Sequence, residues 1–299
     1  MVHEIGLVGL DSSHPGAFAE ILSERDDTTV AAVWDSGAVR SEAYTEEFCE
    51  RHGARRYDDP AEMAGAVDGA MVLTVDWGTH APLAEPFLAE GVPTLVDKPL
   101  AGRLVDVEAI AEAARDGGAG LAGGSALPFH PSVASLAEDG GLRTVYCVGY
   151  GDPFFYGVHP VDVVRTLTGA DWTSVDPRSE PGQAVGVRFE DGSASTVRFD
   201  GSAEDASFGV LSVGDRTRTA HVEGTEEELH RMYGPFLAAF VDVVEGRRDE
   251  RERLVDGASL LLAVDAALES GEVVTPESDA LAGVEKDGAA FLADYSPYY

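Results

Sequence analysis

The sequence predicts a two-domain α/β protein. A Rossmann-like, doubly wound parallel sheet is expected at residues 1–122, and an α+β domain with a large, mostly antiparallel open sheet at 123–299. Two observations predict this class. Short apolar runs alternate with helical patterns through the first part of the chain, which is typical of βαβ units. Later apolar runs follow one another across short polar turns, and two long helical patterns come after them.

In the first domain, short apolar runs predict the strands, and apolar residues at helical spacing predict the helices between them. Strands are expected at 5–10, 30–34, 70–75, 94–96 and 120–123, and helices at 15–23, 41–52, 79–90 and 105–115.

In the second domain, strands are expected at 143–150, 184–189, 193–199, 208–213 and 217–222, and helices at 227–245 and 256–270. Asp191-Gly192 is a strong hairpin signal, and Gly214-Asp215 is a weaker one. These turns predict an antiparallel meander. One face of the meander could meet a partner subunit, so a homodimer or homotetramer through this sheet is expected. The aromatic-rich segment 291–299 is assigned to no element.

The composition is strongly acidic. Asp and Glu number 54 against 21 basic residues, a formal charge of −33, and the pI is near 4.3. This charge repels nucleic acid and anionic membranes, so neither is expected as a partner. The acids are dispersed and 44% of residues are hydrophobic, which argues against disorder. Dispersed acids with almost no lysine are typical of a halophile-like protein; a merely acidic mesophilic protein is the alternative.

Cysteine usage and the first residues indicate the compartment. Cys49 and Cys147 lie far apart without a CxxC pattern, so neither a disulfide framework nor a metal site is expected. The chain opens Met-Val-His-Glu and runs directly into an apolar strand, and no apolar stretch is long enough to span a bilayer. A soluble cytoplasmic protein is therefore expected.

Lys98 is the first candidate for chemistry. Subtracting Lys98 and Lys286 from the 21 basic residues leaves 19 arginines, so lysine is otherwise almost avoided. Lys98 follows the apolar run 94–96, and Pro99 comes directly after it. A buried lysine can lose its proton, whereas arginine effectively cannot. Lys98 is therefore a candidate for proton transfer; a lone surface lysine in a turn is the alternative.

The turn after the first strand resembles a dinucleotide-binding fingerprint with two glycines missing. It reads Gly9-Leu10-Asp11-Ser12-Ser13-His14, so Asp11 and His14 occupy the second and third glycine positions of GxGxxG. We expect the Asp11 carboxylate to point away from the phosphates, and Ser12 and Ser13 to supply hydroxyl donors. The alternative is a turn in which Asp11 or Ser12 caps the helix and nothing binds.

Asp35 strengthens the dinucleotide interpretation. It follows the apolar run 30–34, where an acid can accept both ribose hydroxyls of NAD and disfavour the 2′-phosphate of NADP. NAD is therefore expected as the cofactor, and NADP is less favoured; Arg40 nearby weakens the distinction. The alternative is that Asp35 only starts a polar loop.

Three segments carry a resemblance to a known family. They are Val72-Leu73-Thr74-Val75-Asp76-Trp77-Gly78-Thr79-His80, then Val96-Asp97-Lys98-Pro99-Leu100-Ala101, and Tyr156-Gly157-Val158-His159-Pro160-Val161-Asp162. Together they resemble the glucose–fructose oxidoreductase and inositol dehydrogenase family, Gfo/Idh/MocA. The segment around Lys98 is similar to the Glu-Lys-Pro signature of that family, with Asp for Glu. The segment around His159 is similar to its Gly-x-His-x-x-Asp helix start.

The resemblance implies hydride transfer between a nicotinamide and a sugar, cyclitol or related polyhydroxylated substrate. Lys98 and His159 match the family's catalytic lysine and histidine. Many members carry an Asp four residues before the histidine, where this chain has Phe155. The residues expected at the substrate are Lys98, Phe129, Phe155, Tyr156 and His159. Those expected at the dinucleotide, from the turn, Asp35 and the resemblance together, are Gly9, Leu10, Asp11, Ser12, Ser13, His14, Asp35, Thr74, Val75, Asp76, Trp77, His80 and Asp97.

Other interpretations stay open. His159 could be the N-cap of a helix, with Pro160 at its first position and Asp162 at its third. Asp162 itself is interpreted as structural. Asp11, His14 and Phe155 also suit a dinucleotide- or sugar-binding protein without turnover. A third candidate function is an NAD-dependent lyase or glycosidase-type reaction, in which transient oxidation drives elimination or glycoside cleavage.

Overall fold

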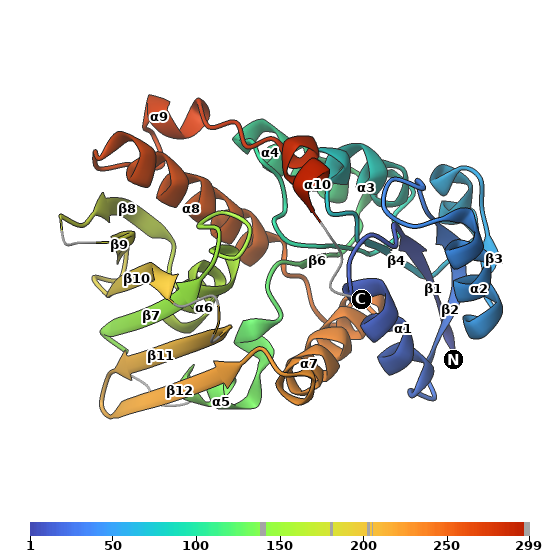
Figure 1. The fold of residues 1–299 in the computed structure, drawn as a ribbon, viewed down its shortest axis with the longest axis horizontal. Helices are drawn as coiled ribbons and strands as arrows, with labels where there is room; N and C mark the ends of the chain where they lie inside the picture. Colours follow the sequence, from blue (N-terminus) through green and yellow to red (C-terminus); the bar gives the residue numbers. More distant parts are fainter. Residues whose placement is uncertain (138–141, 180–181, 202–203, 205, 296–299) are drawn as a thin grey trace.

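The computed structural model describes residues 1–137, 142–179, 182–201, 204 and 206–295, so the end of the aromatic segment 291–299 lies outside it. Within the described residues the chain forms two lobes side by side, each built on a six-stranded sheet (Figure 1). The first sheet is parallel throughout, and the second is mixed and mostly antiparallel. The predicted fold class is confirmed.

The first sheet has the strand order β3-β2-β1-β4-β5-β6. Its lobe contains β1 His3–Val8, α1 His14–Ser23, β2 Thr28–Trp34, α2 Glu42–His52, β3 Arg55–Arg56, the 3-10 helix η1 Pro60–Ala66, β4 Gly69–Val72, η2 Trp77–Thr79, α3 His80–Ala89, β5 Thr94–Val96, α4 Leu104–Gly117 and β6 Leu121–Gly123. The order reverses between β1 and β4. Loops that leave the carboxyl ends of neighbouring strands at such a reversal open a crevice above the sheet.

Capping residues account for several helix ends in this lobe. Ser41 accepts a hydrogen bond from Tyr44 N–H at the start of α2, and Gly53 ends that helix at a φ of +67°. The strand expected at 70–75 is shorter than predicted. Val75 N–H donates to the Asp11 carboxylate instead of to a neighbouring strand, so the chain has left the sheet by then.

The second sheet has the order β12-β11-β7-β10-β9-β8. Its strands are β7 Thr144–Tyr150, β8 Trp172–Pro177, β9 Ala184–Phe189, β10 Ala194–Gly201, β11 Ser207–Val213 and β12 Thr217–Glu223. The two predicted hairpins are confirmed. The predicted meander is wrong, because β7 lies between β10 and β11 and pairs with β10 in parallel. The edge strand β8 was not predicted, since polar residues and a proline hide its alternation.

The remaining helices pack on the second sheet or join the lobes. They are η3 Leu127–Phe129, α5 Pro131–Ala134, η4 Ser135–Ala137, α6 Val158–Thr168, α7 Glu226–Val244, α8 Arg251–Ser270, α9 Asp279–Ala282 and α10 Gly288–Asp294. The two long predicted helices, α7 and α8, are confirmed, although α8 starts earlier, at Arg251. Helix α7 lies beside α1 of the first lobe, and α10 returns to that lobe from α8 and α9 (Figure 1).

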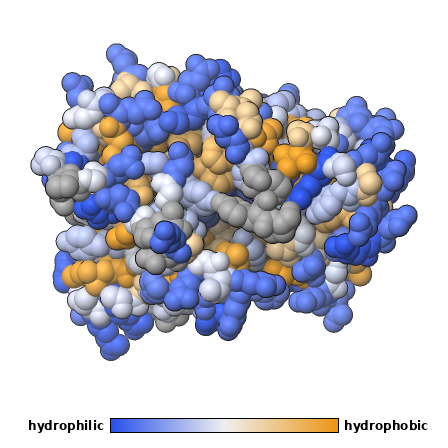
Figure 2. Space-filling model, viewed as in Figure 1, coloured by the Kyte–Doolittle hydropathy of each residue, from blue (hydrophilic) through white to orange (hydrophobic). Residues whose placement is uncertain are grey.

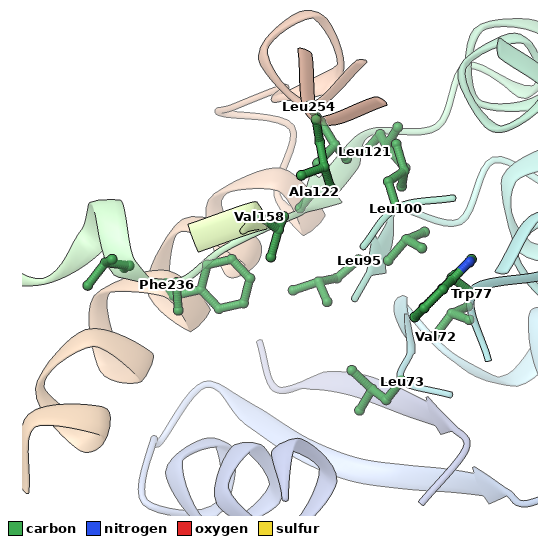
Figure 3. Packing of buried hydrophobic residues seen from close by; sticks show 14 of the residues in the cluster. Val72, Leu73, Trp77, Leu95, Leu100, Leu121, Ala122, Val158, Phe236 and Leu254 are labelled. Carbon is green, nitrogen blue, oxygen red and sulfur yellow. The ribbon is translucent and has the colours of Figure 1, made fainter. Parts of the chain in front are cut away.

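In the described part of the chain, buried apolar residues form one cluster that runs through both lobes. Figure 3 shows side chains of this cluster from both parts of the chain, among them Val72 and Leu95 of the first sheet, Val158 of α6, Phe236 of α7 and Leu254 of α8. A shared core fixes the two sheets relative to each other, because interiors are close-packed. The shape of the crevice between the two sheets is therefore fixed by this core.

The surface reflects the composition. Hydrophilic residues cover most of the face in Figure 2, with smaller hydrophobic areas between them. Among the described residues, none of the helices combines the length and the apolar character needed to cross a membrane.

Candidate active site

A cavity of about 500 Å³ lies at the crevice between the lobes. Pockets of this size commonly hold small molecules. The first lobe contributes loops that leave β1, β4 and β5, with side chains from Ser12, Ser13, His14, Thr74, Val75, Asp97 and Lys98. The second lobe contributes the residues before and within α6, parts of its sheet and the first turns of α7. The cavity thus lies where the strand order of the first sheet reverses.

Lys98 is buried and lines this cavity, with a side chain that packs on aromatic rings. Its Nζ is 3.3 Å from the ring centroid of Phe155 and 5.7 Å from that of Tyr156. Burial lowers the pKa of Lys98 to about 8, although Asp97 acts in the opposite direction. The alternative of a surface lysine in a turn is wrong. The peptide bond from Lys98 to Pro99 is cis.

His159 lines the same cavity from the second lobe. Its Nδ1 lies 2.8 Å from the hydroxyl of Ser125, which also accepts a hydrogen bond from Leu127 N–H. Burial holds the pKa of His159 well below its ordinary value, and the charges of Lys98 and His14 act in the same direction. The imidazole is therefore neutral near pH 7. The N-cap interpretation is wrong: α6 begins at Val158 and its N-cap is Gly157.

His14 and Asp97 form a close pair on the floor of the cavity. Nδ1 of His14 lies 2.6 Å from Oδ2 of Asp97, and the imidazole stacks on Phe18 at 5.1 Å. Burial raises the pKa of Asp97, but the nearby His14 and Lys98 outweigh burial, so that its net pKa is lowered. Asp97 is therefore ionised and accepts the hydrogen bond from His14.

The turn from β1 to α1 packs tightly against the loop after β4. Gly9 has a φ of +94°, and a Cβ there would lie 2.6 Å from Cγ2 of Thr74, so only glycine fits. Asp11 is buried, and its Oδ2 accepts a hydrogen bond from Val75 N–H at 2.9 Å. Burial raises the pKa of this carboxyl. Asp11 thus braces two loops instead of lining the cavity.

The alternative in which Asp11 or Ser12 is the N-cap of this helix is also wrong. The N-cap of α1 is Ser13, which makes no side-chain cap bond, while the hydroxyl of Ser12 accepts from His14 N–H at 3.2 Å. Asp35 supports the turn from β2: its carboxylate accepts from Leu10 N–H at 2.8 Å and from Gly37 N–H at 2.9 Å.

Eight of the expected site residues do not line the cavity: Gly9, Leu10, Asp11, Asp35, Asp76, Trp77, His80 and Phe129. Asp76 caps η2 by accepting from Gly78 N–H. His80 is fully buried, with its ring nitrogens 3.1 Å from the carbonyl of Leu100 and 2.9 Å from that of Thr74. Phe129 packs edge-on against Phe236 of α7, because η3 turns it towards that helix.

The expectations from sequence missed most of the second-lobe wall. The additional lining residues are Leu127, Tyr150, Ala206, Phe208, Val222, Glu223, Gly224, Leu229, Met232, Tyr233 and Tyr295. Most are apolar or aromatic. Tyr150, Phe208, Val222 and Glu223 come from a sheet whose strand order was not predictable, and Leu229, Met232 and Tyr233 come from the predicted helix α7. No local motif marks them, apart from the aromatic character of the segment that contains Tyr295.

Asp162 has the structural role expected of it, although not as a residue of the first helical turn. Its Oδ2 accepts from Ser125 N–H at 2.7 Å, and its Oδ1 lies 3.0 Å from Nη1 of Arg253 on α8. Burial raises the pKa of Asp162, and Arg253 limits the rise. Because Ser125 also contacts His159, this pair supports the wall that carries the imidazole.

The residues present suit a dinucleotide. Helix α1 begins at the cavity, just after Ser12 and Ser13, and the first-turn amides of a helix favour phosphate. Asp35 directly follows the neighbouring strand β2, the position at which an acid can accept the ribose hydroxyls of NAD. Among the described residues, no group of three or more His, Cys, Asp or Glu side chains is placed to hold a metal ion.

Comparison with known proteins agrees with this architecture. Residues 3–124 match the model of the Gfo/Idh/MocA family, described as an oxidoreductase family with an NAD-binding Rossmann fold. No curated protein matches.

Solved structures similar in fold include GenD2 from gentamicin A biosynthesis in complex with NAD, at 20% identity and a TM-score of 0.77, covering 93% of this chain and 97% of that one. A myo-inositol dehydrogenase from Corynebacterium glutamicum has 17% identity and a TM-score of 0.78, over 93% and 100% of the two chains. A scyllo-inositol dehydrogenase from Lactobacillus casei, bound to NAD(H) and scyllo-inositol, has 16% identity and a TM-score of 0.75, over 93% and 100%. Residues 3–124 of this chain are therefore similar to the NAD-binding Rossmann fold of the Gfo/Idh/MocA oxidoreductase family.

Proposed function

We propose that the protein is an NAD-dependent oxidoreductase that transfers a hydride between a nicotinamide and a hydroxyl-bearing carbon of a sugar, cyclitol or related substrate. One observation carries the proposal: Lys98 and His159 line one cavity from opposite lobes, at the carboxyl edge of a Rossmann sheet. The family match over residues 3–124 supports the cofactor, and the inositol dehydrogenases of similar fold support the substrate class.

Several residues of the first lobe would hold the dinucleotide. Ser12, Ser13 and the first-turn amides of α1 would bind the pyrophosphate, and Asp35 would accept the adenosine ribose hydroxyls. The carboxylate of Asp35 disfavours a 2′-phosphate, so NAD is proposed over NADP. Arg40 is already engaged nearby: its Nε donates to Leu10 O at 3.1 Å and its guanidinium lies over the ring of Tyr44. When bound, the nicotinamide would supply the hydride chemistry.

Lys98 would move the proton. With a pKa of about 8, its amine can both accept and donate near neutral pH, the range in which general acid–base catalysis is efficient. In the oxidation direction, the neutral amine would take the proton of the substrate hydroxyl, the hydride of the C–H bond would pass to the bound nicotinamide, and a C=O bond would form. His159, which is neutral, would hydrogen-bond the same hydroxyl and keep it directed at Lys98.

Phe155 changes the site relative to the family pattern. It occupies the place where many members carry an Asp, so the proton route would depend on Lys98 and His159 alone. Phe155, Tyr156 and Phe208 instead form an apolar wall. That wall would contact the C–H face of a ring substrate, while the substrate hydroxyls face Lys98, His14 and His159.

A substrate screen in molar KCl tests the proposal. NAD⁺ and NADP⁺ are incubated with a panel of sugars and cyclitols, and absorbance is followed at the nicotinamide band. For a substrate found in this way, Lys98→Ala should lower kcat by at least about 100-fold and leave the Kd for NADH within about twofold. Arg51→Ala, which removes an exposed cation on α2, is the control. If Lys98→Ala turned over substrate as fast as the wild type, Lys98 would not be the catalytic residue.

Two other candidate functions give different results in the same screen. Asp11, His14 and Phe155 favour a binding protein without turnover, for which NADH would bind while no panel member changes the absorbance. A lyase or glycosidase-type reaction would consume substrate with no net NADH, which product analysis would detect.

A further inference from the structure

The carboxyl-terminal arm, defined as residues 284–295, crosses from α8 back to the first lobe. Trp77 Nε1 donates to Lys286 O at 2.7 Å, and Lys286 N–H donates to Gly102 O at 3.0 Å. The ammonium of Lys286 lies 2.9 Å from Oδ1 of Asp265 on α8. The arm is therefore fastened to both lobes.

The arm also lies in tight contact with the loop after β4. A Cβ at Gly288, the first residue of α10, would meet the Asp76 carboxylate and would lie 2.7 Å from the backbone nitrogen of Trp77. Helix α10 thus approaches this loop as closely as glycine permits. A larger residue at position 288 would push α10 away from the loop after β4.

Aromatic side chains extend the arm into the site. The ring of Phe291 stacks on Phe155 at 4.3 Å and 27°, and it lies 5.3 Å from Trp77. Because a near-parallel ring occupies one face of Phe155, the ammonium of Lys98, 3.3 Å from the same centroid, lies on the opposite face. One turn further on, Tyr295 lines the cavity itself.

We infer that the arm is a third wall of the active site, in which Phe291 is a positioning residue that holds Phe155 against the ammonium of Lys98. This inference rests on the proposed function. The ring of Phe155 shields the amine from water on one side, and Phe291 prevents that ring from turning away. Other charged and titratable groups near the amine are Asp97, His14 on α1, His159 on α6 and the phenol of Tyr156.

Direct titration of the amine tests the inference. The chain contains two lysines, so lysine isotope labelling gives two side-chain signals that NMR can follow from pH 6 to 11 in molar KCl. In the wild type, Lys98 should titrate near pH 8. In Phe291→Ala, loss of the supporting ring should admit water and raise the pKa of Lys98 by about one unit. The signal of Lys286 should change little, which shows that the base of the arm is still docked.

Kinetics give a second readout once a substrate is known. Phe291→Ala should lower kcat on the order of tenfold at pH 7 and shift the pH profile in the alkaline direction, with the Kd for NADH unchanged. Phe291→Tyr should keep the wild-type kcat and pH profile, since it retains the aromatic ring. If Phe291→Ala does not fold, Phe291→Leu keeps most of the apolar volume and removes only the ring.

The possible failures are distinguishable. A wild-type Lys98 that titrates near pH 10.5, without turnover on any substrate, would defeat the proposed function itself. A wild-type value near 8 that stays the same in Phe291→Ala and Phe291→Leu, with unchanged kcat, would overturn the role of the arm. Faster turnover in either variant would also overturn it, because the arm would then be an obstruction.

Discussion

At the scale of single residues, Lys98 is one of two lysines in the chain, and it is buried against the rings of Phe155 and Tyr156. Its scarcity and its place after an apolar run were sufficient to select it as a candidate. Its surroundings were not predictable, because the rings of Phe155 and Tyr156 come from a distant segment of the chain. The environment of His14 is equally non-local: nothing in the defective glycine motif indicates its pairing with Asp97.

The burial of Lys98 has a cost in stability that depends on pH. Its pKa falls from 10.5 in the unfolded chain to about 8 in the fold, so the unfolded chain binds more protons between these values and stability rises with pH there. Below pH 8 the full cost applies, about 3 kcal/mol. Lys98→Met should therefore be more stable than the wild type at pH 7 by up to that amount. The difference should shrink as pH rises towards 10.5.

Chemical denaturation of both proteins across this pH range measures the difference. Lys286→Met is an informative comparison, because it removes an ammonium that is paired with Asp265 and should destabilise instead. A difference between Lys98→Met and wild type that does not vary with pH would contradict the assigned burial.

At the scale of elements, most helices and strands follow from local patterns, whereas their order in the second sheet does not. Hairpin turns indicated which neighbours pair, and Asp191-Gly192 does join β9 to β10. The insertion of β7 beside β10 depends on pairing between residues far apart in sequence, which no local signal records. Helix α10 was missed for a similar reason, since its support comes from Trp77 and Phe155.

A buried ionic cluster joins α6, α8 and the end of β6, and it offers a test at this scale. Arg253 contacts Asp162 and Glu250 and also donates to Gly123 O at 3.2 Å. Arg253→Met would leave two buried carboxylates without this cation, which typically costs about 3–5 kcal/mol. Arg231→Met, which removes an exposed ion pair with Glu228, should cost less than about 1 kcal/mol. Similar losses in the two variants, measured by denaturation in molar KCl, would refute the cluster's importance.

At the scale of the whole molecule, composition predicts behaviour that the fold alone does not. The formal charge of −33 is spread over both lobes, and the Debye length falls from about 10 Å at 0.1 M salt to about 3 Å at 1 M. Lowering KCl from 2 M to 0.1 M should therefore decrease Tm, on the order of 10 °C. Calorimetry at several salt concentrations measures this, and a Tm indifferent to salt would contradict a halophile-like surface.

The second sheet leaves apolar side chains on an exposed face, which supports the proposed homodimer or homotetramer. Tyr146 and Val148 of β7 are 45% and 38% exposed. Burying such side chains in a subunit interface would stabilise association. Tyr146→Glu should shift sedimentation towards the monomer, whereas Val105→Glu, at an exposed apolar position on α4, should not. A wild-type protein that sediments as a monomer at high concentration would exclude this interface.

In the proposed enzyme, Lys98 lies beside the bound nicotinamide in the cavity that it shares with His159. Titration of the labelled lysines by NMR, with and without NAD⁺, tests this claim without knowledge of the substrate. Binding of NAD⁺ should shift the Lys98 signal and lower its pKa below about 8, because the nicotinamide ring is cationic, and should leave Lys286 unchanged. A Lys98 signal that titrates near pH 10.5 and does not respond to saturating NAD⁺ would contradict the account.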